Sequence, residues 1–85
     1  MRAPRLTLYS RPGCHLCDEM KDVIARVAAH VPIDLSVVDI SADAALEARY
    51  GPEIPVLEID GRKAAKYRIS EGELERALRG RASQV

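Results

Sequence analysis

The chain has 85 residues, enough for one domain with a modest core, since chains of about 60 residues can fold alone. Lys and Arg together number 13, as do Asp and Glu, so the net charge is zero and nothing predicts a nucleic-acid surface. No apolar run approaches the roughly 18 residues of a membrane span, and residues 1–10 are too polar for a signal peptide. We therefore expect one cytoplasmic domain over residues 1–85, with no nucleic-acid or membrane partner.

The first elements follow from a change of hydrophobic period. Residues 5–10 alternate Leu with Thr and Tyr, which predicts a β-strand, and the Pro-Gly pair at 12–13 predicts a turn. Apolar residues then recur at spacings of three and four, the pattern of an amphipathic helix. This helix is expected to begin at about Cys14 or His15 and to end at about His30.

A strand and a short helix come next. Residues 33–40 have apolar side chains at alternate positions, which predicts a strand with one buried face. The residues expected on that face are Ile33, Leu35 and Val37. Ser41 is expected to cap a helix over residues 42–50, and Gly51-Pro52 is a stop signal.

The last third of the chain predicts a hairpin and a final helix. Residues 54–60 form the third strand, Asp60-Gly61 a two-residue hairpin turn, and residues 62–69 a polar fourth strand at the sheet edge. Ser70 and Glu73 have the spacing of a capping box.

The final helix carries Leu74, Ala77 and Leu78 inward and is expected to stop near Gly80, followed by a frayed tail over about residues 81–85. The predicted order is β-α-β-α-β-β-α. It gives an α/β fold with a four-stranded mixed sheet flanked by helices, in which the first two strands are parallel.

Cys14 and Cys17 are the two cysteines of the chain, and in a reducing cytosol such a pair is expected to be catalytic or metal-binding. Cys14 falls where a helix begins, so free backbone N–H groups and the positive helix end favour its thiolate. Arg11 can add a positive charge. Such surroundings lower a cysteine pKa from about 8.5 into a range of roughly 3.5 to 7.5, so Cys14 is the predicted nucleophile.

Cys17 lies nearly one helical turn later, ahead of two acidic residues that oppose its ionisation. We expect Cys17 to resolve the mixed disulfide that Cys14 forms with a substrate, leaving a Cys14–Cys17 disulfide. His15 has two readings that stay open: an imidazolium that stabilises the Cys14 thiolate, or an exposed residue at the helix start.

Ile54-Pro55 opens the third predicted strand, where a proline is tolerated at the first residue. Beside a helix-start CxxC pair in this element order, a cis Ile54–Pro55 bond is expected to bring its backbone against the cysteines.

The segments "LYSRPGCHLC", "EIPVLEID" and "DISADAALEARYG" resemble the glutaredoxins of the thioredoxin superfamily, and in particular a group of short bacterial glutaredoxin-like proteins. The resemblance implies a thioredoxin-like fold and a dithiol-disulfide oxidoreductase with a redox-active disulfide. It assigns Cys14 as nucleophile, Cys17 as resolving thiol and Pro55 as the cis-proline. It also assigns Arg11 to the basic position near the nucleophile, and the Ile54 backbone to pairing with substrate.

Two departures concern glutathione. His15-Leu16 replaces the Pro-Tyr usual between glutaredoxin cysteines, and Ala65-Lys66 replaces the Gly-Gly pair that grips glutathione, with no acidic residue before Glu71. Glutathione as a co-substrate is therefore placed in doubt. The expected partners are disulfide-containing proteins or low-molecular-weight thiols, and we expect a monomer with no bound cofactor or metal.

Two alternatives remain beside the oxidoreductase. A structural zinc site needs four ligands, so only a dimer that supplies two CxxC pairs would hold a metal ion or an iron–sulfur cluster. The second alternative is a non-catalytic thioredoxin-fold adaptor whose cysteines serve binding or regulation.

Overall fold

The computed structural model describes residues 3–82, and its elements follow the predicted order. The strands are β1 (Arg5–Ser10), β2 (Asp34–Asp39), β3 (Val56–Ile59) and β4 (Arg62–Lys66). The helices are α1 (His15–Ala28), α2 (Ala44–Tyr50) and α3 (Glu71–Ala82), with 3₁₀ turns η1 (Ile40–Ala42) and η2 (Gly51–Glu53) on either side of α2.

The strands form one mixed sheet in the order β2-β1-β3-β4. β1 pairs with β2 in parallel, and β3 pairs with both β1 and β4 in antiparallel fashion. The β3–β4 turn has Asp60 at φ 49° and Gly61 at φ 84°, the two positive values that a type I′ hairpin requires. The predicted hairpin, and the position of the fourth strand at the sheet edge, are confirmed.

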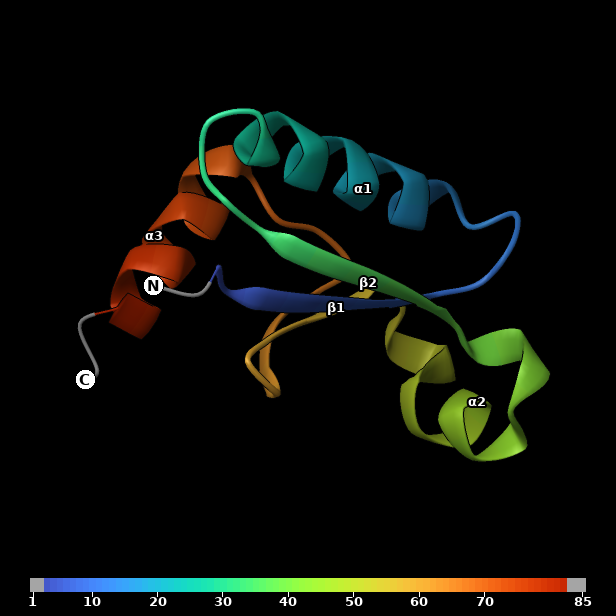
Figure 1. Cartoon of the computed structure of the whole chain (residues 1–85). Helices are drawn as coiled ribbons and strands as arrows, with labels where there is room; N and C mark the ends of the chain where they lie inside the picture. The colour runs from blue at the N-terminus through green and yellow to red at the C-terminus, as the bar shows by residue number, and fades with distance from the viewer. Residues whose placement is uncertain (1–2, 83–85) are drawn as a thin grey trace.

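Helices cover both faces of the sheet (Figure 1). On one face, α1 and α3 pack on side chains that point from alternate positions of β1 and β3. This core consists of Leu6, Leu8, Met20, Ile24, Val27, Leu57, Ile59, Leu74 and Leu78. On the other face a smaller cluster joins Ile40, Tyr50 and Val56, with α2 supplying Tyr50. The predicted α/β class and the layered arrangement are confirmed.

The predicted buried face of the second strand is wrong for Leu35 and Val37, whereas Ile33, just before β2, is partly buried against the core. Leu35 is 38% exposed and Val37 is 48% exposed, although they pair with the buried Leu6 and Leu8 of β1. The reason is position: β2 is an edge strand, and the core under α1 and α3 is built on β1 and β3. Alternation predicted the strand, but it did not predict how far the helices extend over the sheet.

The predicted cap of α2 is also wrong. Asp43, not Ser41, is the N-cap: its carboxylate accepts hydrogen bonds from the N–H groups of Ala45 and Leu46 at 2.9 and 3.2 Å. Ser41 lies within η1, where its own N–H and hydroxyl donate to the carboxylate of Asp39. The acid nearest the helix therefore takes the capping role, because only its side chain reaches the free N–H groups of the first turn.

The ends of the last two elements also differ from the prediction. β4 ends at Lys66, because Tyr67 adopts a left-handed conformation (φ 68°) that breaks the strand. The capping box is confirmed: Ser70 N–H donates to Glu73, and Glu73 N–H donates to the Ser70 hydroxyl. α3 continues past Gly80 to Ala82, so residues 81 and 82, predicted as part of the tail, are helical; residues 83–85 lie outside the described residues.

Candidate functional site

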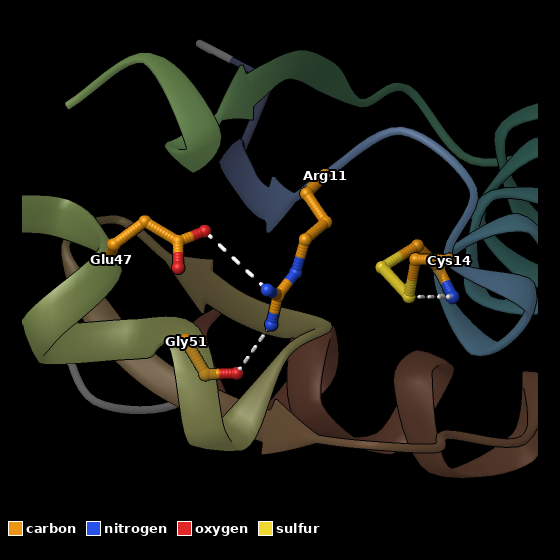
Figure 2. The surroundings of a disulfide bond; sticks show 5 residues. Arg11, Cys14, Glu47 and Gly51 are labelled. Carbon is orange, nitrogen blue, oxygen red and sulfur yellow. Dashed lines mark hydrogen bonds and ion pairs between the residues drawn. A yellow bond between two sulfur atoms is a disulfide. The ribbon is translucent and has the colours of Figure 1, made fainter. Parts of the chain in front are cut away.

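Cys14 and Cys17 meet at the N-terminus of α1 and are joined by a disulfide bond, with Cα atoms 5.2 Å apart. Cys14 is the N-cap residue, and its Sγ accepts a hydrogen bond from the N–H of Cys17 at 3.1 Å (Figure 2). A sulfur in this position replaces the oxygen that usually caps a helix. The same N–H and the positive end of α1 favour a negative charge on Sγ of Cys14 after reduction.

The two sulfurs differ in access to solvent. Cys14 is half-buried, whereas Cys17 is 1% exposed and lies among the buried residues of α1. A disulfide of another molecule can therefore approach Cys14 but not Cys17. This asymmetry is what a nucleophile and an internal resolving thiol require.

His15 is exposed and pairs with an acidic residue of α1. Its imidazole is 87% exposed, and Nε2 lies 2.9 Å from the carboxylate of Glu19, one turn along α1. Of the two readings of His15, the geometry favours the exposed residue at the helix start, with its ring held by an i,i+4 pair.

Arg11 joins the loop before α1 to the C-terminal end of α2. Its guanidinium donates a hydrogen bond to the carbonyl of Gly51 at 2.9 Å and lies 3.6 Å from a carboxylate oxygen of Glu47 (Figure 2). The positive charge therefore lies between an acid and the negative end of a helix. Arg11 remains beside the cysteine loop, but its direct partners belong to α2 and η2.

The Ile54–Pro55 peptide bond is cis, as predicted. Ile54 is extended (φ −63°, ψ 148°), a conformation that suits pairing with a second extended chain. Pro55 is buried, and its carbonyl accepts a hydrogen bond from the N–H of Tyr67 at 2.9 Å. The Tyr67 hydroxyl donates to the carbonyl of Pro52 at 3.3 Å. Tyr67, the residue after β4, therefore binds both ends of the segment from Pro52 to Pro55.

Ion pairs between Glu53 and two lysines of β4 connect the segment 52–55 to the edge strand. Glu53 accepts hydrogen bonds from Lys63 at 2.7 Å and from Lys66 at 3.2 Å. These hydrogen bonds lower the pKa of the Glu53 carboxyl below its ordinary value of 4.5. Glu53 therefore stays ionised near neutral pH and keeps the turn before Ile54 tied to the edge strand.

Behind the segment, Tyr9 and Tyr50 stack with ring centroids 4.0 Å apart and planes 13° apart. The Tyr50 hydroxyl donates to the carboxylate of Glu58 at 3.1 Å, and the Tyr9 hydroxyl donates to its other oxygen at 3.5 Å. Burial, followed by its hydrogen bonds to Tyr9 and Glu58, raises the pKa of Tyr50 to about 12. This network joins β1, α2 and β3 on the face opposite α1.

The six predicted site residues lie on two segments: Arg11, Cys14, His15 and Cys17 around the start of α1, and Ile54 and Pro55 before β3. The two segments adjoin paired strand ends, because Tyr9 near the end of β1 pairs with Val56 at the start of β3. Sequence reasoning missed Glu47 and Gly51, the partners of Arg11. From the sequence, Tyr67 could line the edge of the site or pack against the sheet, with packing preferred; the residue is 42% exposed, which favours the edge of the site. The pairing of Arg11 with Glu47 had no local signal, because 36 residues separate them.

Within residues 3–82 no group of three or more His, Cys, Asp and Glu side chains lies close enough to hold a metal ion. Two cysteines of one chain provide two ligands, so a tetrahedral metal site would need a second copy. Over the same part of the chain, no helix has the length and hydropathy to cross a membrane.

Known proteins share this fold, and some of them also share part of this sequence. The crystal structure of a protein from X. campestris has 37% sequence identity to this chain and a TM-score of 0.76, and the match covers 88% of this chain and 96% of that one. A Nitrosomonas europaea protein is 25% identical with a TM-score of 0.79, over 92% of this chain and 94% of that one. Thioredoxin 1 of Thermosipho africanus, at 17% identity and a TM-score of 0.60 over 92% of this chain and 98% of that one, shares the fold alone.

An uncharacterized protein of Mycobacterium tuberculosis is 27% identical over an alignment 79 residues long, which covers 87% of this chain and 81% of that protein. Residues 5–79 match the family described as glutaredoxin-like domain (DUF836), a match that includes both cysteines and the cis-proline. Family and fold together support a redox role for the cysteine pair. The chain belongs to the glutaredoxin-like domain family, and it has the fold of thioredoxin.

Proposed function

We propose that this protein is a dithiol-disulfide oxidoreductase that reduces disulfides of proteins or small molecules through Cys14 and Cys17. The observation that carries the proposal is the asymmetry of the pair: Cys14, at the helix N-terminus, is a half-buried residue, and Cys17, nearly one turn later, is a buried one. Family membership supports the same chemistry.

The reaction proceeds in two exchanges. The Cys14 thiolate attacks one sulfur of a substrate R–S–S–R′, so that a Cys14–S–S–R bond forms and R′–S⁻ leaves and takes up a proton. Cys17 then loses its proton and attacks Sγ of Cys14, which releases R–S⁻ and forms the Cys14–Cys17 disulfide. Two electrons pass from the dithiol to the substrate, and an external thiol or dithiol returns the pair to the reduced form.

The surroundings of the pair serve these steps. The N–H of Cys17 stabilises the negative charge on Sγ of Cys14 before it attacks the substrate disulfide. The extended backbone at Ile54 offers a strand-like edge for the substrate chain. Three hydrogen bonds hold the residues just before Ile54 in place. Arg11 binds Gly51 from the cysteine loop, Lys63 of β4 binds Glu53, and Tyr67 binds Pro52.

The test is equilibration of the protein with reduced and oxidised glutathione at several ratios, acid quenching and measurement of intact mass. We expect a reversible loss of two hydrogen atoms, with a transient adduct on Cys14 if glutathione is the partner. Cys14→Ser should abolish exchange, because Cys17 is buried, whereas Cys17→Ser should accumulate a mixed disulfide at Cys14.

Three results separate the candidates. Oxidation without an adduct keeps the oxidoreductase and assigns it protein disulfides or another small thiol. Full exchange activity in Cys14→Ser would show that the roles of the two cysteines are misassigned. A pair that forms no disulfide at any ratio would overturn the proposal and favour the metal-binding or adaptor alternative.

A further inference from the structure

The cysteine loop has a single side chain with a permanent positive charge. Arg11 is the one Arg or Lys between Ser10 and Met20, the stretch that contains both cysteines. The other base of this stretch, His15, lies 2.9 Å from the carboxylate of Glu19. Any lasting positive charge that the loop presents to an approaching substrate therefore comes from the guanidinium of Arg11.

Residues from the C-terminal half of α2 and from η2 engage this guanidinium. Its Nη2 donates a hydrogen bond to the Gly51 carbonyl at 2.9 Å, and its Nη1 lies 3.6 Å from Oε1 of Glu47. Figure 2 shows the Arg11 side chain directed toward these two residues. Gly51 leaves room for the acid, because a Cβ at that position would lie 3.3 Å from Oε2 of Glu47. Carboxylate and guanidinium therefore lie together beside the loop that carries Cys14.

This pairing changes what Arg11 offers to an anion. A guanidinium binds a carboxylate best through two parallel N–H groups, and both terminal nitrogens of Arg11 already face an oxygen of α2 or η2. The side chains of Arg11 and Glu47 are both partly exposed, so a molecule at the cysteine loop meets the acid together with the base. An anionic substrate therefore gains little net attraction from Arg11.

We propose that Glu47 is a specificity-determining residue, which withholds the positive charge of Arg11 from substrates that carry a carboxylate close to the reacting disulfide. The inference rests on the proposed function and narrows its substrate class to disulfides whose neighbouring groups are neutral or cationic. The exchange itself is the one given above: Cys14 and Cys17 give two electrons and two hydrogen atoms to R–S–S–R, which leaves as two molecules of R–SH. Glu47 acts through Arg11 on the approach of the substrate and takes no part in bond making.

The test uses three symmetrical disulfides: dithiodipropionate, which is anionic at neutral pH, cystamine, which is cationic, and bis(2-hydroxyethyl) disulfide, which is neutral. Each has the same group on both sulfurs, so the rate does not depend on which sulfur Cys14 attacks. Reduced protein is mixed with each disulfide at neutral pH and an ionic strength of about 0.1 M, and acid quenching followed by intact mass measures the disappearance of the reduced form.

The readout is the ratio of the anionic rate to the cationic rate, compared between each variant and the wild-type protein. The intrinsic reactivity of each disulfide cancels in this comparison, and so does any general change in the reactivity of the Cys14 thiolate. The rate with the neutral disulfide reports separately whether a variant is folded and active.

Three substitutions separate the charge of Glu47 from its shape and from the net charge of the protein. Glu47→Gln removes the charge and keeps the shape, whereas Glu47→Asp keeps the charge. Glu75→Gln is the matched control, since it makes the same change of charge at an acid that pairs with His30, beyond the C-terminal end of α1. The 14 residues of α1 place this pair about 20 Å from the cysteines, roughly twice the screening length at that ionic strength.

We expect Glu47→Gln to raise the anionic-to-cationic ratio about fourfold, because the freed guanidinium attracts a carboxylate and repels an ammonium group through a few ångströms of solvent. Glu47→Asp and Glu75→Gln should keep the wild-type ratio. In about 1 M salt, where screening acts within roughly 3 Å, the change in Glu47→Gln should fall below about twofold.

An Arg11→Met background identifies the group through which Glu47 acts. There Glu47→Gln should change the ratio by less than about twofold, since no guanidinium is left to be freed. A fourfold change in that background, the same change in Glu75→Gln, or an unchanged ratio in Glu47→Gln would each overturn the inference. The oxidoreductase would remain intact in all three cases, as the rate with the neutral disulfide would show.

The failure of the proposed function looks different. In that case none of the three disulfides, the neutral one included, reacts with the wild-type protein faster than with a free thiol. The specificity role of Glu47 then falls together with the enzyme.

Discussion

At the scale of single residues, Arg11 shows how one side chain connects two loops of the site. Its guanidinium, 40% exposed, reaches the Gly51 carbonyl, which lies just past the C-terminus of α2, and the Glu47 carboxylate one turn earlier. The hydrogen bond closes a helix end whose carbonyls lack partners within the helix. Since Glu47 balances part of the charge, the main effect expected of Arg11 is to hold the cysteine loop against the segment that leads to Ile54.

The stability of an Arg11→Met variant tests this role. The substitution keeps the aliphatic stem and removes the hydrogen bond, so we expect a loss of about 1 kcal/mol in the free energy of unfolding, at the low end for a charged donor because the group is partly exposed. Urea denaturation measures the loss. Arg62→Met is the control, since Arg62 is exposed and no ion pair is found for it within residues 3–82. Equal stability of the two variants would contradict a tethering role.

At the scale of elements, α2 depends on its ends. It has seven residues, too few for a helix that is stable by itself in water. Its N-terminus is capped by two hydrogen bonds to Asp43, and its inner face contributes the buried Tyr50. α2 leads directly into η2 and the Ile54–Pro55 segment, so loosening its first turn removes support from one side of the site.

The two candidate caps can be separated by mutation. Asp43→Ala should lower the free energy of unfolding by about 1 kcal/mol, because two N–H groups of the first turn lose their acceptor. Ser41→Ala should cost less, since its hydroxyl contacts only the carboxylate of Asp39. Thermal or urea unfolding of both variants gives the comparison. A larger loss in Ser41→Ala would restore the capping role that the sequence pattern predicts.

At the scale of the whole molecule, the packed layers depend on a polar network as well as on apolar burial. Tyr9 from β1, Tyr50 from α2 and Glu58 from β3 contact one another across the sheet face opposite α1. Glu58 is partly buried, and the two hydroxyl groups supply donors to both of its oxygens. The network joins the strand before the cysteine loop to the strand after the cis-proline, and thereby supports both halves of the site.

The pH dependence of stability tests this network. Because burial raises the pKa of Tyr50 from 10.0 to about 12, the folded state favours the neutral phenol. The stabilisation is present in full below pH 10 and is lost as the pH rises from 10 toward 12. We expect the free energy of unfolding to fall more steeply over this window in the wild-type protein than in Tyr50→Phe. Absorbance at alkaline pH should also lose its latest phenolate step in that variant, and identical curves would contradict the assignment.

The sequence alone determined the features that depend on neighbouring backbone groups. The change of period after residue 13 predicted the strand-to-helix junction that places Cys14 at a helix start. The Asp60-Gly61 turn and the Ser70–Glu73 capping box were predicted for the same reason, since turns and caps are made by residues a few positions apart. The Ile54–Pro55 bond was predicted by combining a local proline with the order of elements.

Only the tertiary structure decided what depends on residues far apart in the chain. Leu35 and Val37 have the alternation of a half-buried strand, yet they are exposed because the sheet order places β2 at an edge. The partners of Arg11 likewise come from a segment that meets its loop only in the folded chain. Burial and long-range pairing follow from which surfaces face each other, and a local pattern specifies a face without specifying what covers it.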